Sequence, residues 1–417
     1  MSEQLTETKH NAEQKSQYIS VSERLKNFKP GTIRTVKHYP TGIRKLDTVL
    51  GGGLYAGLTF LGARPGMGKS TFALQIASQI ASANYPVLFY SLEMPSIRME
   101  SKILNRAIHL KYPDSDITSD WLLREEALSS KNRKKWDIVE QIETDISEQY
   151  NCLYIKERNK VAFSARDIIQ DTEQFIREKK QRPILFVDYL QILSSCSDSR
   201  TMTERQKNDE NINALSALSN KYGLAVFIIS SLNRESYRDE QRPLRMDSFK
   251  ETGSIEYSAS VILGMQPRNI RHPGFNYEVE MSKDARELEL VFLKQRYGAS
   301  GMQANVSLDF YAAKDLYLES NASNNTGNGT SATVTADSIS SDKKVTADST
   351  SFVTKSTANV KSVTPVKKTT TVHKAAPVYQ TPSTHSADQA TEQSALQYPD
   401  DPRARLIAEF RRQQKEH

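Results

Sequence analysis

The chain has 417 residues, 2 cysteines and a formal net charge of +6, with a pI near 9.0. Two isolated cysteines exclude a disulfide framework, and the sequence offers neither an apolar leader nor an apolar run long enough to cross a bilayer. We therefore expect a cytoplasmic protein, and the mild basic excess permits a polyanionic partner without requiring one.

Composition divides the chain into four segments. Residues 1–35 form a polar lead-in arm with a candidate linker helix over 21–28, and residues 36–319 have the apolar content of a folded domain. Residues 320–400 are rich in Ser and Thr, which predicts a disordered linker because such a segment buries too little apolar surface to fold. Residues 401–417 form a short basic amphipathic segment; a docking peptide for a protein or nucleic acid and a solvated chain end explain it equally well.

Within residues 36–319, short apolar runs alternate with helix-length segments. The runs cover residues 58–61, 87–92, 153–155, 184–193, 224–232, 261–265 and 288–293. This alternation predicts an α/β fold with a mostly parallel central sheet flanked by helices. A helical stripe within 205–222 is followed by Gly223, which is placed to end that helix. Alternating apolar residues after position 300 predict a terminal hairpin at the edge of the sheet.

The most informative segment is residues 62–71, Gly-Ala-Arg-Pro-Gly-Met-Gly-Lys-Ser-Thr, which lies between a strand-like run and a helix-like run. A loop of small residues at the start of a helix binds phosphates with its backbone amides, so we predict ATP as the ligand. Lys69 would contact the outer phosphates, and the Ser70 hydroxyl would bind Mg²⁺. Ala63 stands where the strict motif has Gly, and a turn that binds nothing is the alternative. The predicted nucleotide contacts are Ala63, Arg64, Pro65, Gly66, Met67, Gly68, Lys69, Ser70 and Thr71.

Two acids follow other strand-like runs and are predicted to lie at the same edge of the sheet as this loop. Asp188 ends the apolar stretch that begins at residue 184, and there it would orient the Mg²⁺ shell. The alternative for Asp188 is an acid that caps a turn. Glu93 follows the first strand after the loop and is the candidate general base that polarises the attacking water. For Glu93, an exposed acid that starts the next helix is an equally good explanation.

Several motifs, in this order along the chain, resemble the C-terminal motor domain of the DnaB-type replicative helicases over residues 41–319. They are Ser91-Leu92-Glu93-Met94-Pro95, Asp188-Tyr189-Leu190-Gln191, Leu232-Asn233-Arg234, Gly253-Ser254-Ile255-Glu256 and Lys294-Gln295-Arg296. The resemblance implies a RecA-like P-loop fold. It also implies an ATP-dependent DNA helicase or translocase that acts on single-stranded DNA as a ring in DNA replication.

The resemblance assigns roles to particular residues. Glu93 would be the catalytic base and Asp188 would bind the magnesium. Arg296 would be an arginine finger that enters the nucleotide site of a neighbouring subunit, with Lys294 beside it. A finger supplied by a neighbour requires an oligomer, and the family ring is a hexamer. On the residues alone, Lys294 and Arg296 are simply alternate positions on a solvated strand face.

The DNA-binding loop of the family corresponds to residues 250–253 of this sequence. Lys250, Glu251 and Gly253 are therefore the candidate contacts to single-stranded DNA. Contact with phosphates rather than bases would suit a motor that passes along any sequence. It predicts binding that depends on salt and not on base sequence.

Two of the departures from the family pattern bear on function. Ser231 stands where the family has a Gln that senses the γ-phosphate, so ATP turnover is expected to persist while its dependence on DNA weakens. Residues 1–40 are too few for the helical collar that engages primase in the family, and a primase partner is not expected. These departures keep a second hypothesis open: a non-unwinding ATPase that regulates, tethers or loads a replication partner.

Overall fold

The computed structural model describes residues 20–26, 37–158, 162–197, 202–233, 235–238, 240–249, 252–298 and 304–320. Most of the predicted arm, the segment 321–417 and two candidate DNA contacts, Lys250 and Glu251, lie outside these ranges. The short helix α2 (Val21–Lys26) falls within the candidate linker helix. No helix in the described ranges is long and apolar enough to cross a membrane.

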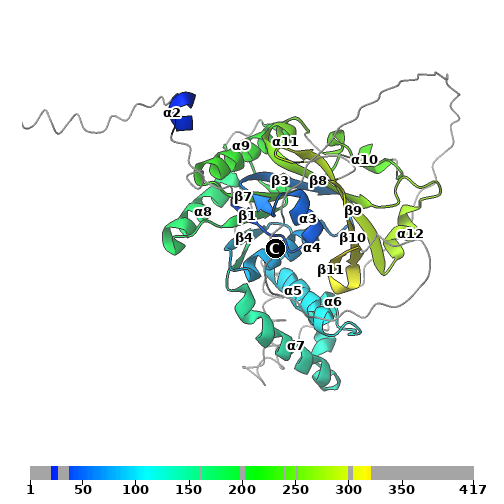
Figure 1. Cartoon of the computed structure of the whole chain (residues 1–417). Coiled ribbons are helices and arrows are strands. Elements are labelled where there is room, and N and C mark those ends of the chain that lie inside the picture. Colours follow the sequence, from blue (N-terminus) through cyan, green and yellow to red (C-terminus); the bar gives the residue numbers. More distant parts are fainter. Residues whose placement is uncertain are drawn as a thin grey trace, which may run out of the picture. The chain divides into compact units, whose positions relative to one another are not determined.

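A nine-stranded sheet forms the centre of the fold, with the strand order β11-β10-β9-β8-β3-β7-β6-β4-β5 (Figure 1). The strands are β3 (Gly57–Ala63), β4 (Val87–Ser91), β5 (Leu153–Glu157), β6 (Ile184–Asp188), β7 (Ala225–Ser230), β8 (Ala259–Pro267), β9 (Ala285–Gln295), β10 (Val306–Tyr311) and β11 (Leu316–Glu319). The strands from β8 to β5 in this order run parallel. The pairs β8–β9, β9–β10 and β10–β11 are antiparallel. The prediction of a mostly parallel sheet is thereby confirmed.

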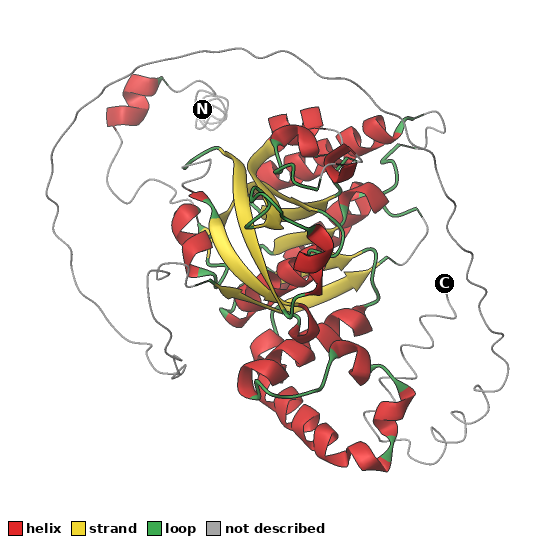
Figure 2. Cartoon of the chain, turned by 90° about the vertical axis from the view of Figure 1, so that its right-hand side faces the viewer, coloured by secondary structure: helices red, strands yellow, loops and turns green. Residues whose placement is uncertain are grey.

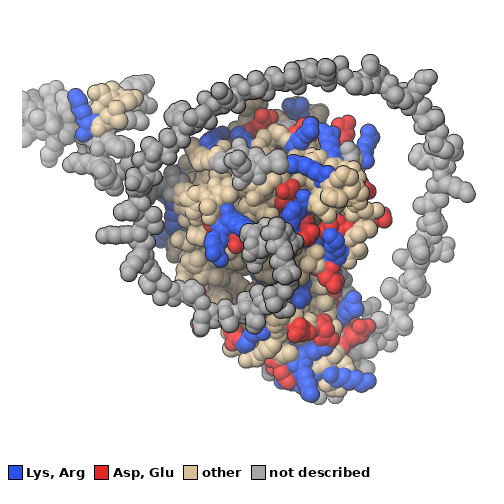
Figure 3. Space-filling view, turned by 45° about the vertical axis from the view of Figure 1, so that its right-hand side comes forward, with Lys and Arg blue, Asp and Glu red and all other residues tan. Residues whose placement is uncertain are grey.

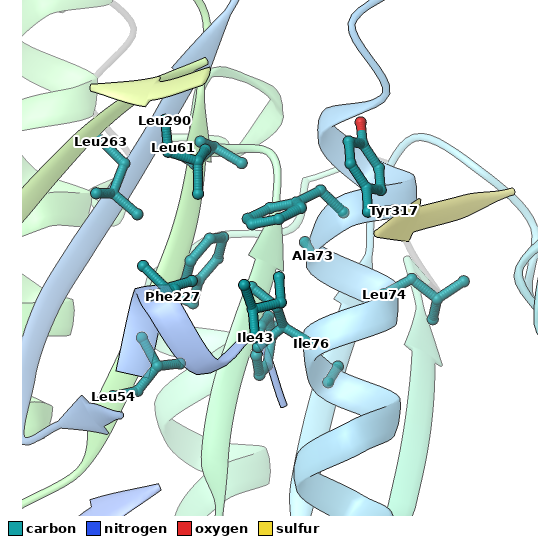
Figure 4. Close-up of a cluster of buried hydrophobic side chains, with 14 of the residues drawn as sticks. Ile43, Leu54, Leu61, Ala73, Leu74, Ile76, Phe227, Leu263, Leu290 and Tyr317 are labelled. Carbon is teal, nitrogen blue, oxygen red and sulfur yellow. The ribbon is translucent and has the colours of Figure 1, made fainter. Parts of the chain in front are cut away.

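Helices cover both faces of the sheet because the central strands are apolar along their length. β4, β6, β7 and β8 are buried at every residue. On one face, α4 (Lys69–Ser82) contributes Ile76 to a core that also contains Phe227 of β7, and Figure 4 shows both side chains in this cluster. On the other face, α8 (Ala165–Lys179) and α9 (Glu204–Tyr222) pack against a second core.

The predicted helix end and the predicted hairpin are both confirmed. Helix α9 ends at Tyr222, and Gly223 follows in the left-handed region with φ of 64°. Strands β10 and β11 form an antiparallel hairpin, and β11 is the edge strand of the sheet. Gly can adopt this left-handed conformation without the steric cost that other residues incur.

The predicted strand over residues 184–193 is wrong beyond Asp188. Strand β6 ends at Asp188, and the chain then forms a short 3-10 helix, η4 (Leu190–Ile192). Leu190 and Leu193 nevertheless remain buried in the second core. An apolar run predicts burial, and a strand and a tight helical turn satisfy burial equally well.

A helical lobe between β4 and β5 is absent from the sequence prediction. It contains α5 (Ser96–Lys111), α6 (Ser119–Leu122) and α7 (Arg133–Ser147), which gather below the sheet in Figures 1 and 2. The lobe has its own core around Ile108, Trp136 and Ile142. On the face shown in Figure 3, Lys and Arg side chains are interspersed with Asp and Glu over the lobe.

Shorter elements lie in the connections. The strands β1 (His38–Tyr39) and β2 (Leu54–Tyr55) form a two-stranded antiparallel ribbon, and α3 (Arg44–Val49) lies between them in the sequence. The helices α10 (Glu235–Arg238) and α11 (Thr252–Ser258) precede β8, and α12 (Tyr277–Ser282) lies between β8 and β9. The other 3-10 helices in the described ranges are η1 (Glu125–Leu128), η2 (Ser130–Asn132), η3 (Glu148–Tyr150), η5 (Met246–Ser248) and η7 (Ala312–Lys314).

Candidate nucleotide-binding site

The predicted phosphate loop connects the end of β3 to the start of α4. Gly66 and Gly68 both have left-handed backbone conformations, with φ of 79° and 76°. A side chain at Gly68 would also collide with the Tyr317 hydroxyl and the Phe310 ring, at 2.4 and 2.7 Å from the added carbon. Gly68 accepts the first hydrogen bond of α4, from Phe72 N at 2.8 Å. The loop therefore leads directly into the helix N-terminus, which is a favourable place for an anion.

A cavity of about 540 Å³ opens beside this loop. Six of the nine predicted nucleotide contacts line it, namely Pro65, Gly66, Gly68, Lys69, Ser70 and Thr71. The other three, Ala63, Arg64 and Met67, are at most 5 % exposed and are absent from the lining.

Lys69 extends along the loop from the first turn of α4. Its Nζ donates to the carbonyls of Ala63 at 3.1 Å and Arg64 at 3.4 Å. Burial lowers the pKa of Lys69, while the negative charges of Asp188 and Glu93 raise it. An ammonium group that has lost hydration in this way gains more from an anionic ligand than an exposed one does.

Asp188 is buried at the end of β6, and its peptide bond to Tyr189 is cis. Burial raises the pKa of Asp188 to about 6; a hydrogen bond from Ser70 lowers it, the charge of Glu93 raises it and Lys69 lowers it. Its Oδ2 has no hydrogen-bond partner within the part of the chain that the structure describes. A carboxylate oxygen and a hydroxyl are oxygen ligands of the kind that Mg²⁺ prefers, so Ser70 and Asp188 fit the predicted metal.

Glu93 approaches the same cavity from the neighbouring strand. Ser91 is the register partner of Asp188, and Leu92 N donates to Asp188 O at 2.8 Å. This pairing places Glu93 just beyond the end of β4, where its side chain is exposed and lines the cavity. The two predicted acids are therefore brought together at one edge of the sheet.

Ser231, the departure from the family pattern, also lines the cavity. It follows β7, and its backbone N donates to Gln191 Oε1 at 3.0 Å. The side-chain amide of Gln191 also donates from its Nε2 to Ser230 Oγ at 3.0 Å. Gln191 thus fixes the backbone at the end of β7, beside a side chain that is much shorter than Gln.

Lys294 and Arg296 do not reach this cavity. Lys294 pairs with Ile262 near the start of β8, whereas the phosphate loop follows the opposite end of the neighbouring β3. Lys294 Nζ donates to the carbonyl of Glu256, and Arg296 Nη2 donates to the carbonyl of Tyr257 at 3.2 Å. Burial lowers the pKa of Lys294, and the nearby charge of Arg296 lowers it further. Both cations therefore lie at the opposite ends of the strands from the phosphate loop of the same chain.

Gly253 is the one predicted DNA contact among the described residues. It lies in α11, which leads directly into the start of β8. The Ser254 hydroxyl donates to Asp209 of α9, so α11 packs against that helix. Gly253 therefore lies away from the cavity. It lies at the same ends of the strands as Lys294 and Arg296.

Some residues that line the cavity belong to none of the sequence motifs described above. Arg286, Phe310, Lys102 and Asp315 line the cavity from β9, β10, α5 and the turn before β11. Lys102 Nζ and Asp315 Oδ1 form an ion pair at 2.5 Å. The sequence holds no local signal for them, because their proximity arises from the packing of the terminal hairpin against α4 and α5.

The sheet order, the loop after β3 and the acids at the ends of β4 and β6 define a P-loop domain of the RecA-like class. Residues 39–317 match the family described as the DnaB-like helicase C terminal domain, so the chain belongs to this family. The resemblance inferred from the motifs is thereby confirmed.

The curated relatives are replicative helicases. The chain is 28 % identical over 265 residues to "Replicative DNA helicase DnaB" of Haemophilus influenzae, covering 63 % of this chain and 51 % of that protein. It is 26 % identical over 267 residues to the protein of the same name from Geobacillus stearothermophilus, covering 63 % and 53 %. The chain thus spans about half the length of the curated relatives it matches.

Two solved structures share the fold. "ATPase Domain of G40P" has a TM-score of 0.55 and 21 % identity, covering 72 % of this chain and 95 % of that one. "The Structure Of A DnaB-Like Replicative Helicase And Its Interactions With Primase" has a TM-score of 0.56 and 20 % identity, covering 76 % and 70 %. At this identity the likeness establishes the fold, and the primase named in the second title is a partner of that protein.

Proposed function

We propose that this chain is an ATP-hydrolysing motor that acts on single-stranded DNA as a ring of identical subunits. One observation carries the proposal: Lys69, Glu93 and Asp188, from three separate elements, line a single cavity beside a phosphate loop. The family membership supports the same function, since the curated relatives are named replicative DNA helicases.

The geometry suggests a separate role in ATP binding or hydrolysis for each of these residues. The phosphates of ATP would lie against the loop amides and the N-terminus of α4, with Lys69 at the outer phosphates. Ser70 and Asp188 would hold Mg²⁺, which neutralises phosphate charge when it is bound. Glu93 would accept a proton from the attacking water while the water oxygen bonds to the γ-phosphorus and the bond to the bridging oxygen breaks.

A ring would explain the position of the predicted finger. Lys294 and Arg296 lie at the far edge of the sheet, so they would act on the nucleotide of an adjacent subunit rather than on their own. We propose a hexamer, the ring size that the family resemblance implies. Hydrolysis would then depend on the contact between neighbouring subunits.

Single-stranded DNA would contact the segment that contains Lys250, Glu251 and Gly253. Of these, Gly253 lies at the same sheet edge as Lys294 and Arg296. Binding through the phosphate backbone predicts an affinity that falls with salt and varies little with base sequence.

The second candidate is an ATPase of the same fold that does not unwind DNA but regulates, tethers or loads a replication partner. Ser231 favours it, because this residue lines the cavity at the position of the family Gln and its side chain is two bonds shorter. A Ser hydroxyl would reach a γ-phosphate only through water, which weakens any relay from ATP to DNA.

Steady-state ATP hydrolysis with and without single-stranded DNA, run beside unwinding of a forked duplex, separates the two candidates. The motor predicts turnover that DNA stimulates, together with strand separation. Turnover that ignores DNA, without strand separation, would favour the second candidate. Absence of turnover at any DNA concentration would refute both.

A further inference from the structure

The phosphate loop receives hydrogen bonds from three residues that follow it by more than 200 positions. We call these residues the loop donors. The bonds are Tyr277 Oη to Pro65 O at 2.9 Å, Arg286 Nη1 to Gly66 O at 2.8 Å, and Tyr317 Oη to Met67 O at 2.6 Å. The donors come from α12, β9 and β11, and they bind three successive carbonyls of the loop.

We infer that the loop donors are positioning residues that set the direction of the loop amides toward the phosphates. In a trans peptide the C=O and the following N–H point in opposite directions. A donor that holds the Pro65 carbonyl outward therefore turns the Gly66 N–H inward, and a donor on the Met67 carbonyl does the same for the Gly68 N–H. Arg286 acts on the peptide between them, whose Met67 N–H donates to Arg64 O at 3.4 Å within the loop. The inference rests on the proposed function, in that the loop binds a nucleotide.

Tyr317 is held rigidly, as a positioning residue must be. Its backbone N donates to Gln75 Oε1 at 2.9 Å, and its carbonyl accepts from Gln75 Nε2 at 2.9 Å. Its ring is stacked on Phe310 with centroids 4.2 Å apart, and the side chain is 2 % exposed. The hydroxyl therefore has a fixed position beneath Met67.

Arg286 adds charge to the same contact. Its guanidinium lies 5.7 Å from the centre of the Phe310 ring and lines the cavity. Its Nε is buried and has no hydrogen-bond partner among the residues that the structure describes. Arg286 thus holds a loop carbonyl with one nitrogen while its positive charge faces the cavity in which the phosphates would lie.

Tyr277 is a loop donor that is less buried than Tyr317. Its ring lies 5.5 Å from the Arg64 guanidinium, and Tyr277 is the first residue of the short helix α12. Because this side chain is only partly buried, removing its hydroxyl disturbs the core less than the same change at Tyr317.

The test uses the full chain and measures ADP binding with Mg²⁺ by isothermal titration calorimetry, together with kcat and KM for ATP. We expect Tyr277→Phe and Tyr317→Phe each to weaken ADP binding by roughly twofold to tenfold, the cost of one hydrogen bond to a backbone carbonyl. KM for ATP should rise by a similar factor, with a smaller change in kcat. Tyr222→Phe is the matched control, since it removes a phenol hydrogen bond to Glu173 that lies remote from the cavity.

ADP affinity equal to that of the unchanged protein in a folded Tyr277→Phe variant would overturn the inference for that donor. A lower melting temperature with unchanged ADP affinity in Tyr317→Phe would show a purely structural role. If the unchanged protein binds ADP but DNA does not stimulate its turnover, the proposed motor function is refuted. The role of the loop donors in nucleotide binding is then unaffected. No ADP binding by the unchanged protein would overturn both.

Discussion

Replacing Asp188 with Asn is expected to stabilise the metal-free protein while removing its response to Mg²⁺. Burial raises the pKa of the Asp188 carboxyl from 3.8 to about 6, so the folded state holds this proton more tightly than the unfolded state does. The stability gained from protonation is complete below pH 3.8 and is lost as the pH rises through about 6. The Asn side chain resembles the protonated carboxyl at every pH.

The size of the effect follows from the pKa difference. A difference of about two units corresponds to at most about 3 kcal/mol in the free energy of unfolding at neutral pH. Of this, about 1 kcal/mol is lost by the unchanged protein between about pH 5 and about pH 7. The advantage of Asp188→Asn in unfolding free energy should therefore grow by about 1 kcal/mol over that interval.

Urea unfolding in EDTA, followed by circular dichroism at several pH values across this interval, measures the difference. Asp120→Asn is the control for net charge, because Asp120 is an exposed acid on the helical lobe. A difference between Asp188→Asn and the unchanged protein that stays constant with pH would refute the argument. In a second arm, ADP with Mg²⁺ should raise the unfolding midpoint of the unchanged protein and not that of Asp188→Asn.

Four other substitutions address different parts of the chain. Lys69→Ala should abolish ATP turnover, because the phosphates lose their buried cation; phosphate release measures it. Arg296→Ala should also abolish turnover yet leave ADP affinity within about twofold, since the finger acts across subunits; full turnover would remove the shared-site model. Ser231→Gln should increase the stimulation of ATP turnover by single-stranded DNA. If the ratio of turnover with DNA to turnover without DNA does not change, residue 231 has no role in coupling ATP hydrolysis to DNA. Trp136→Phe should destabilise the protein by about 1 kcal/mol through loss of the bond from Nε1 to Ala127 O at 2.7 Å, without altering ADP affinity.

The parts of the site that could be predicted are those in which chemistry and local pattern coincide. Lys69 and Ser70 lie in one short segment with its own strand and helix, and Asp188 and Glu93 follow apolar runs. In a parallel sheet such runs end at a common edge, so their proximity follows from the pattern. The structure places Lys69, Ser70, Asp188 and Glu93 around one cavity.

The loop donors could not be predicted in the same way. Tyr277, Arg286 and Tyr317 reach the loop only because β9 and β11 lie on one side of β3 and α12 bridges back over the loop. Nothing in the local sequence distinguishes these side chains from other aromatic or basic residues. The alternating pattern predicts the terminal hairpin, but it does not tell on which side of β3 this hairpin lies or which of its side chains reach the loop.

The helical lobe shows a different limit of prediction from sequence. The segment between β4 and β5 is long enough for several helices, but its sequence alone does not tell whether such helices pack on the sheet or on one another. In the structure, Trp136 and Ile142 pack with Ile108 of α5 in a core separate from both sheet cores. Periodicity identifies a buried face, and the partner of that face is decided by tertiary packing.

The loop donors also have a consequence for the order in which the protein matures. The three hydrogen bonds join residues 212, 220 and 250 positions apart. A nascent chain that has emerged as far as β8 already carries the complete phosphate loop, Glu93 and Asp188, but none of the loop donors. Contacts between such distant residues form late, because closing a long loop costs conformational entropy. Tight nucleotide binding would therefore arise only when the terminal hairpin has docked, so that ADP affinity reports the completion of folding.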